Sequence, residues 1–225
     1  MLNKSKGNMY KFVTHTWNTI KGQCPHDCSY CYMKRRGKQS PVHLDEKELK
    51  TDLGSGNFIF VGSSCDMFAE DIPTEWIRET LAHCAEFDNR YLFQSKNPGR
   101  MRHWIPYVSK VVACTTIETN RWHKDIMGGS PSPPIERTED MCWIGAPTYL
   151  TIEPIMDFDL DDLVEMVDLV DPIQVNIGAD SGNNNLPEPS AEKVRELIAR
   201  LEEFTRVVQK KNLKRLKETP ATRAE

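Results

Sequence analysis

Residues 17–33 read WNTIKGQCPHDCSYCYM and bring three cysteines, Cys24, Cys28 and Cys31, within eight positions. The other cysteines of the chain lie far from these three and from one another. A structural zinc site usually takes four ligands, so three clustered thiols predict a metal centre that keeps one position open. The spacing C-x3-C-x2-C suits three corners of one [4Fe–4S] cluster, because cluster iron is commonly held by cysteine.

The segment before this loop is the first of six short apolar or β-branched runs that predict strands. The runs cover residues 10–18, 57–62, 90–95, 110–117, 147–153 and 172–178. Amphipathic helical patterns lie between several of them, at 73–87 and 159–170, and a last helical pattern runs from Ser190 to Val208. Strands that alternate with helices favour a parallel α/β sheet, and six strands are too few for a closed eight-stranded barrel. We therefore predict a partial (β/α)6 barrel of parallel strands, with a doubly wound sheet as the alternative.

The totals indicate a globular chain of 225 residues, with 39% hydrophobic and 28% charged residues. We expect residues 1–210 to form a single α/β domain and residues 211–225 to form a charged C-terminal tail that frays. The chain lacks a long apolar run and its N-terminus lacks a signal-peptide pattern, so we expect a cytoplasmic protein with no membrane contact. A net charge of -4 argues against a protein built mainly to grip nucleic acid, although it leaves room for a local basic groove.

The cysteine loop directly follows the first predicted strand, where ligands of α/β sheets gather. With Tyr30 just before the third cysteine, this loop resembles the signature of the radical SAM superfamily. The resemblance implies a [4Fe–4S] cluster on Cys24, Cys28 and Cys31, with S-adenosyl-L-methionine on the open iron. It also implies reductive cleavage of S-adenosylmethionine to a 5′-deoxyadenosyl radical, which abstracts hydrogen from a substrate. An external one-electron reductant of the flavodoxin or ferredoxin type is a further implication.

Other segments match the same superfamily, each at the carboxyl end of a predicted strand. They are GSSCDMF from Gly62, TTIE from Thr115, TIEP from Thr151 and VNIGADSG from Val175. The resemblance assigns cofactor binding to Tyr30, Ser63, Ser64, Asp66, Thr116, Glu118, Glu153, Asn176 and Gly178.

The segments SKNPGRM, TIEPI and NIGADSG also resemble a phage-associated branch of radical SAM proteins that is similar to spore photoproduct lyase, a DNA repair enzyme. This resemblance implies an unassigned reaction whose substrate includes nucleic acid or a nucleotide among its candidates. It also makes Cys65 the candidate catalytic residue, as a hydrogen-atom donor, with Cys114 as a second candidate for that role. The basic loop from Lys96 to His103 is a candidate for binding a phosphate or a carboxylate, or it is a solvated helix start.

Two other functions remain open from the residues alone. A non-enzymatic adaptor would hold zinc on the three cysteines and complete the site with His26, His15 or a distant cysteine. A redox or electron-transfer protein would keep the cluster without using S-adenosylmethionine. Zinc in place of iron would indicate the adaptor. A cluster that does not cleave S-adenosylmethionine would indicate the redox or electron-transfer protein.

Overall fold

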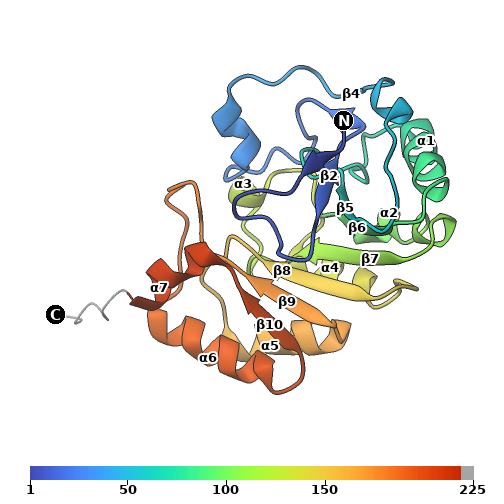
Figure 1. Ribbon diagram of the computed structural model, residues 1–225. Coiled ribbons are helices and arrows are strands. Elements are labelled where there is room, and N and C mark those ends of the chain that lie inside the picture. Colours follow the sequence, from blue (N-terminus) through green and yellow to red (C-terminus); the bar gives the residue numbers. More distant parts are fainter. Residues whose placement is uncertain (219–225) are drawn as a thin grey trace.

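The computed structural model describes residues 1–218 and shows one curved eight-stranded sheet (Figure 1). The strand order is β1-β2-β5-β6-β7-β8-β9-β10, and every neighbouring pair is parallel except β1 and β2. The strands of this sheet are β1 Asn3–Lys4, β2 His15–Trp17, β5 Phe58–Val61, β6 Arg90–Gln94, β7 Val111–Thr116, β8 Thr148–Ile152, β9 Gln174–Ile177 and β10 Arg206–Gln209. A separate antiparallel pair consists of β3 Ile20–Lys21 and β4 His43–Leu44. The predicted α/β architecture of parallel strands in an open barrel is confirmed.

Two details of the strand prediction are wrong, and the short strands β1, β3 and β4 were not predicted. The first strand forms only over His15–Trp17, because residues 10–13 leave the sheet and pack on its concave face. A seventh parallel strand, β10, lies beside β9 where the sequence pattern predicted the end of the last helix. That helix ends at Glu202, and the Thr205 hydroxyl donates to the carbonyl of Pro172, 2.6 Å away, at the start of the new strand. The β-branched pair Val207 and Val208 then favours an extended backbone.

Helices cover the outer face of the sheet (Figure 1). They are α1 Thr74–Ala85, α2 Pro98–Met101, α4 Pro134–Met141, α5 Leu160–Val170 and α6 Ala191–Glu202. The short helix α3 Lys124–Met127 lies beside the cysteine loop instead. Alternate strand residues such as Ile59, Phe93 and Leu150 join the main hydrophobic core with the apolar stripes of α1, α5 and α6. The predicted N-cap of α6 is confirmed, because the Ser190 hydroxyl accepts from the backbone N–H of Lys193.

The concave face carries a second, smaller core made by the other set of alternating strand residues. Phe60, Leu92 and Cys114 belong to it, and they contact Tyr10 and Val13 of the N-terminal segment. The Tyr10 hydroxyl also donates to Oε1 of Gln94 at 2.9 Å. The N-terminal segment therefore fills the lower part of the concave face and leaves the carboxyl ends of the strands for a binding site.

The C-terminal segment packs on the domain as far as Glu218, contrary to the expectation of a fraying tail after residue 210. Residues Lys211–Leu213 form the 3-10 turn η4 and Lys214–Glu218 form α7. Leu213 and Leu216 are buried in the main core. The rest of the expected tail, residues 219–225, lies outside the described residues. Among residues 1–218, none of the helices combines the length and the apolar character needed to cross a bilayer.

Candidate active site

A cavity of about 960 Å³ opens at the carboxyl ends of the strands, between the N-terminal segment and the cysteine loop. The structure brings together most of the residues that the sequence predicts for the site. Those that line the cavity are Cys24, Cys28, Tyr30, Cys31, Ser63, Ser64, Cys65, Asp66, Thr116 and Glu153. Glu118, Asn176 and Gly178 lie behind the lining rather than in it.

Short backbone turns shape the cysteine loop. The N–H of Asp27 donates to the carbonyl of Cys24 at 3.2 Å, and the N–H of Cys31 donates to that of Cys28 at 3.1 Å. The 3-10 turn η1, Tyr32–Arg36, follows at once. Gly128 approaches from the segment after α3 with a φ of 94°, and a Cβ there would overlap the carbonyl oxygen of His26. Only glycine permits this approach, so the loop is held against a distant part of the chain.

A buried histidine–carboxylate pair anchors the loop to the sheet. His26 Nε2 lies 2.7 Å from Oδ2 of Asp66, and both side chains are buried. The same oxygen accepts from the Ser95 hydroxyl at 3.0 Å and from the Lys96 N–H at 2.8 Å. Burial acts to raise the pKa of Asp66, but His26 and the backbone donors hold that pKa below its ordinary value. Asp66 therefore ties the cysteine loop to the ends of β5 and β6.

The loop after β5 is fixed by Asn18, which directly follows β2. Its Oδ1 accepts from the Ser63 hydroxyl at 3.2 Å and from the Ser64 N–H at 3.0 Å. Gly62 enters this loop with a φ of 77°, which favours glycine. The two predicted serines thus face the cavity on a loop whose geometry depends on a side chain from the neighbouring strand.

The thiols differ in their readiness to bind metal. A hydrogen bond with the Cys65 thiol lowers the pKa of Cys24 to about 6, so Cys24 carries substantial thiolate at neutral pH. The same contact and burial raise the pKa of Cys65. Burial raises the pKa of Cys28 as well. Among the described residues, no group of three or more histidine, cysteine and acidic side chains is arranged to hold a single metal ion.

A buried charged cluster lies under the cysteine loop. Glu118 is fully buried and accepts from the ammonium of Lys96, from the Tyr30 hydroxyl and, at 3.0 Å, from Arg137. The Lys96 ammonium also donates to the Tyr30 hydroxyl at 2.5 Å. Burial acts to raise the pKa of Glu118, but Arg137 and Lys96 outweigh it and lower that pKa to about 2. Glu118 is therefore an anion that positions Tyr30 and Lys96.

Sequence reasoning placed Lys96 only in a basic loop and missed Arg137. Lys96 lines the cavity, and its position directly after β6 was the signal that could have found it. Arg100 of that basic loop has a structural role. The Arg100 guanidinium donates to the backbone carbonyls of Ala69, Glu70 and Ile72, so the expectation of a free anion-binding loop is wrong for Arg100.

A second polar cluster forms around Glu153 at the far wall of the cavity. Its carboxylate accepts from Lys210 at 2.6 Å, from Asn8 at 3.0 Å and from Asn212 at 3.0 Å. Gly178 makes room for it, since a Cβ there would lie 2.6 Å from Oε1 of Glu153. Gly178 thus accommodates Glu153 in this structure, and its predicted cofactor role stays a prediction.

Asn176 does not face the cavity. Its side chain is buried in the sheet, where Oδ1 accepts from Gln174 at 2.8 Å and the amide donates to the carbonyl of Leu150 at 3.3 Å. Both halves of its amide are therefore satisfied by protein groups.

Comparisons with known proteins agree with this architecture. No protein-family model and no curated protein matches the sequence. Among solved structures, a single-residue mutant of spore photoproduct lyase matches with a TM-score of 0.62 and 10% identity over 89% of this chain and 78% of that one. A double mutant of that lyase with bound AdoMet and dinucleoside spore photoproduct matches with a TM-score of 0.55 and 12% identity, over 88% of this chain and 64% of the lyase. SuiB of Streptococcus suis, bound to its precursor peptide SuiA, matches with a TM-score of 0.60 and 11% identity, over 86% of this chain and 48% of SuiB.

The fold is similar to that of the radical SAM enzymes spore photoproduct lyase and SuiB. The likeness supports the fold that the sequence predicted, and at these identities it concerns the fold alone. The chain spans about two thirds of the lyase with bound AdoMet and about half of SuiB. Within the radical SAM fold, the three cysteines of this chain line the cavity at the carboxyl ends of the strands.

Proposed function

We propose that this protein is a radical SAM enzyme whose cluster is held by Cys24, Cys28 and Cys31. The observation that carries the proposal is that all three cysteines line one cavity, at the carboxyl ends of the strands of a radical SAM fold. The donor set fits a [4Fe–4S] cluster, because it offers three thiols, one of them with its pKa lowered to about 6, and leaves one position open. When bound, the cluster and S-adenosylmethionine would supply reductive cleavage to a 5′-deoxyadenosyl radical that abstracts hydrogen.

The chain's own residues would hold and orient these groups. Asp66 and His26 fix the cysteine loop, and Glu118 fixes Tyr30 and Lys96. Ser63, Ser64, Thr116 and Glu153 present hydroxyl and carboxylate oxygens to the cavity, where they can bind ammonium and ribose groups. Lys96 brings a cation to the same wall and suits a carboxylate.

The substrate and the hydrogen-atom donor are the finer part of the proposal. Cys65 lines the cavity and is the candidate donor, since its thiol lies against the site. An external reductant of the flavodoxin or ferredoxin type would supply the electron. Nucleic acid or a nucleotide is the candidate substrate, and the solved lyase with a dinucleoside photoproduct supports this choice.

Iron and sulfide content tests the ligand assignment. After anaerobic reconstitution we expect about four iron atoms and four sulfides per wild-type chain, and close to none in Cys28→Ala. Cys142→Ser is the matched control, because Cys142 is exposed and lies outside the cavity lining. The control should load like the wild type. Zinc in place of iron would support the adaptor function and overturn the proposal, as would full loading of Cys28→Ala.

A further inference from the structure

Cationic side chains dominate the charged lining of the cavity. Those that line it are Lys4, Lys6, Arg35, Arg36, Lys96 and Lys210, against only two carboxylates, Asp66 and Glu153. This excess stands out in a chain whose net charge is -4. Both carboxylates are already engaged, Asp66 by His26 and Glu153 by Lys210. Lys96 is paired with Glu118 behind the lining. The positive charge that the protein leaves unneutralised therefore lies on the four remaining cations of the lining.

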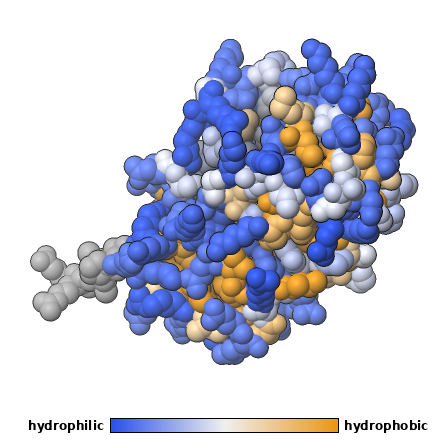
Figure 2. All heavy atoms as spheres, in the orientation of Figure 1, coloured by the Kyte–Doolittle hydropathy of each residue, from blue (hydrophilic) through white to orange (hydrophobic). Residues whose placement is uncertain are grey.

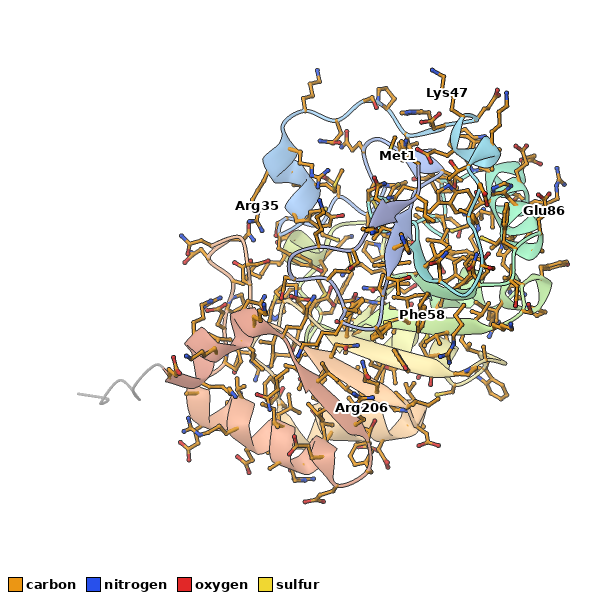
Figure 3. All side chains as sticks on the ribbon, viewed as in Figure 1. Met1, Arg35, Lys47, Phe58, Glu86 and Arg206 are labelled. Atoms are coloured by element: carbon orange, nitrogen blue, oxygen red, sulfur yellow. The ribbon has the colours of Figure 1, made fainter. Side chains whose placement is uncertain are left out.

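Four of these cations form what we term the cationic rim, namely Lys4, Lys6, Arg35 and Arg36. They come from two segments of the chain, β1 with the residues after it and the turn η1, and all four are exposed. None of them forms an ion pair within residues 1–218. Arg35, labelled in Figure 3, donates to the carbonyl of Ser181 at 3.0 Å, and both residues line the cavity.

An aromatic ring lies within the rim. Tyr32 is 45% exposed and lines the cavity, and its hydroxyl donates to the carbonyl of Ser63 at 2.8 Å. The guanidinium of Arg36 lies 5.9 Å from the centre of this ring. Hydrophilic residues cover the part of the surface around η1 in Figure 2. An exposed ring fixed by its hydroxyl and flanked by arginine can stack a nucleobase, while the guanidinium binds phosphate.

We infer that the cationic rim binds the phosphodiester backbone of a single nucleic-acid strand and leads one nucleotide into the cavity. What happens to that nucleotide in the cavity depends on the proposed function. The binding of the strand by the cationic rim does not require the cluster. Unpaired exposed cations explain attraction of any polyanion. The arginine forks and the exposed ring favour a nucleic-acid strand over an acidic peptide, which offers neither phosphate nor a base to stack.

The test is the binding of a fluorescein-labelled single-stranded DNA of about twelve nucleotides, a length within the range of a single-strand site, followed by fluorescence anisotropy. Four phosphate contacts predict a slope of log affinity against log salt of about −3 for a single strand. The variant K4Q/K6Q/R35Q/R36Q should bind at least about tenfold more weakly with a flatter slope. K4Q/K6Q alone, which leaves the Arg35–Ser181 contact intact, should lower the slope by about 1.

The matched control is R78Q/R206Q, which removes exposed cations outside the cavity lining. Arg78 lies on α1. Arg206 starts β10, at the end of the strands opposite to the cavity (Figure 3). The control should bind like the wild type. Equal binding by the rim variants, or equally tight binding of a labelled polyglutamate peptide of the same charge, would overturn the inference. Cleavage of S-adenosylmethionine without DNA binding would reject this inference alone, and DNA binding without cleavage would reject only the proposed function.

Discussion

Glu118 shows how single residues hold the site together. Its carboxylate is fully buried and faces Lys96, Arg137 and Tyr30. Removing a buried charge leaves its partners uncompensated, which typically costs about 3–5 kcal/mol. We therefore expect Glu118→Gln to lower the free energy of unfolding by about this amount at pH 7, measured by urea denaturation. Glu79→Gln, an exposed change on α1, is the control and should stay close to the wild type.

The same residue predicts a pH dependence. The pKa of Glu118 falls from 4.5 to about 2 on folding, so its stabilisation is complete above about pH 4.5. It is lost as the pH falls toward 2, and it amounts to about 3 kcal/mol. Between pH 5 and pH 3 the wild type should lose more stability than Glu118→Gln, compared by urea denaturation at each pH. Parallel curves for the two proteins would show that Glu118 does not keep its charge.

The sequence identified the residues of the site better than their roles. The spacing of Cys24, Cys28 and Cys31 predicted a shared centre because neighbours in the chain are neighbours in space. Asp66 was expected to contact a cofactor, yet its partner is His26, 40 positions away. Such pairing depends on which loops meet at the end of the sheet, and local patterns do not contain that information.

At the scale of elements, β10 and the segment after it were the hardest to predict. The apolar residues from Val194 to Val208 fit a helical period by coincidence of spacing, although the chain turns at Phe204 and enters a strand. Pairing with β9 overrides that periodicity, because an edge strand gains backbone hydrogen bonds and a β-branched pair suits them. The strands β5, β6, β7, β8 and β9 were predicted well, since their runs are short, β-branched and bounded by turn residues.

If the C-terminal segment packs on the domain, substitutions at its buried positions should destabilise the protein, whereas in a fraying tail they should not. Leu213 is fully buried in the main core, and cavity-forming changes at such positions cost about 2–5 kcal/mol. We expect Leu213→Ala to lower the free energy of unfolding by this amount in urea denaturation. Lys214→Ala, at an exposed neighbouring position, should change it by less than about 0.5 kcal/mol. Two indistinguishable variants would mean that the segment does not pack in solution.

In the molecule as a whole, the apolar cores that stabilise the open barrel lie apart from the cavity that carries the candidate active site. Its outer face is an apolar core covered by helices, and the N-terminal segment fills part of the concave face. Polar and charged groups then gather at the carboxyl ends of the strands, where the cavity opens. The alternation of strands and helices predicted the open parallel barrel, but it did not predict that the N-terminal segment packs on the concave face. The cationic rim was not predictable, because it joins Lys4 and Lys6 to Arg35 and Arg36 only through the fold.

We propose that S-adenosylmethionine is cleaved reductively when it is bound in this cavity. The most direct measurement is anaerobic: the reconstituted protein is reduced with dithionite, mixed with S-adenosylmethionine, and assayed for 5′-deoxyadenosine by mass spectrometry. We predict that the wild type forms 5′-deoxyadenosine and that Cys28→Ala forms none. A wild-type protein that carries a complete cluster yet forms no 5′-deoxyadenosine would contradict the claim and favour an electron-transfer protein.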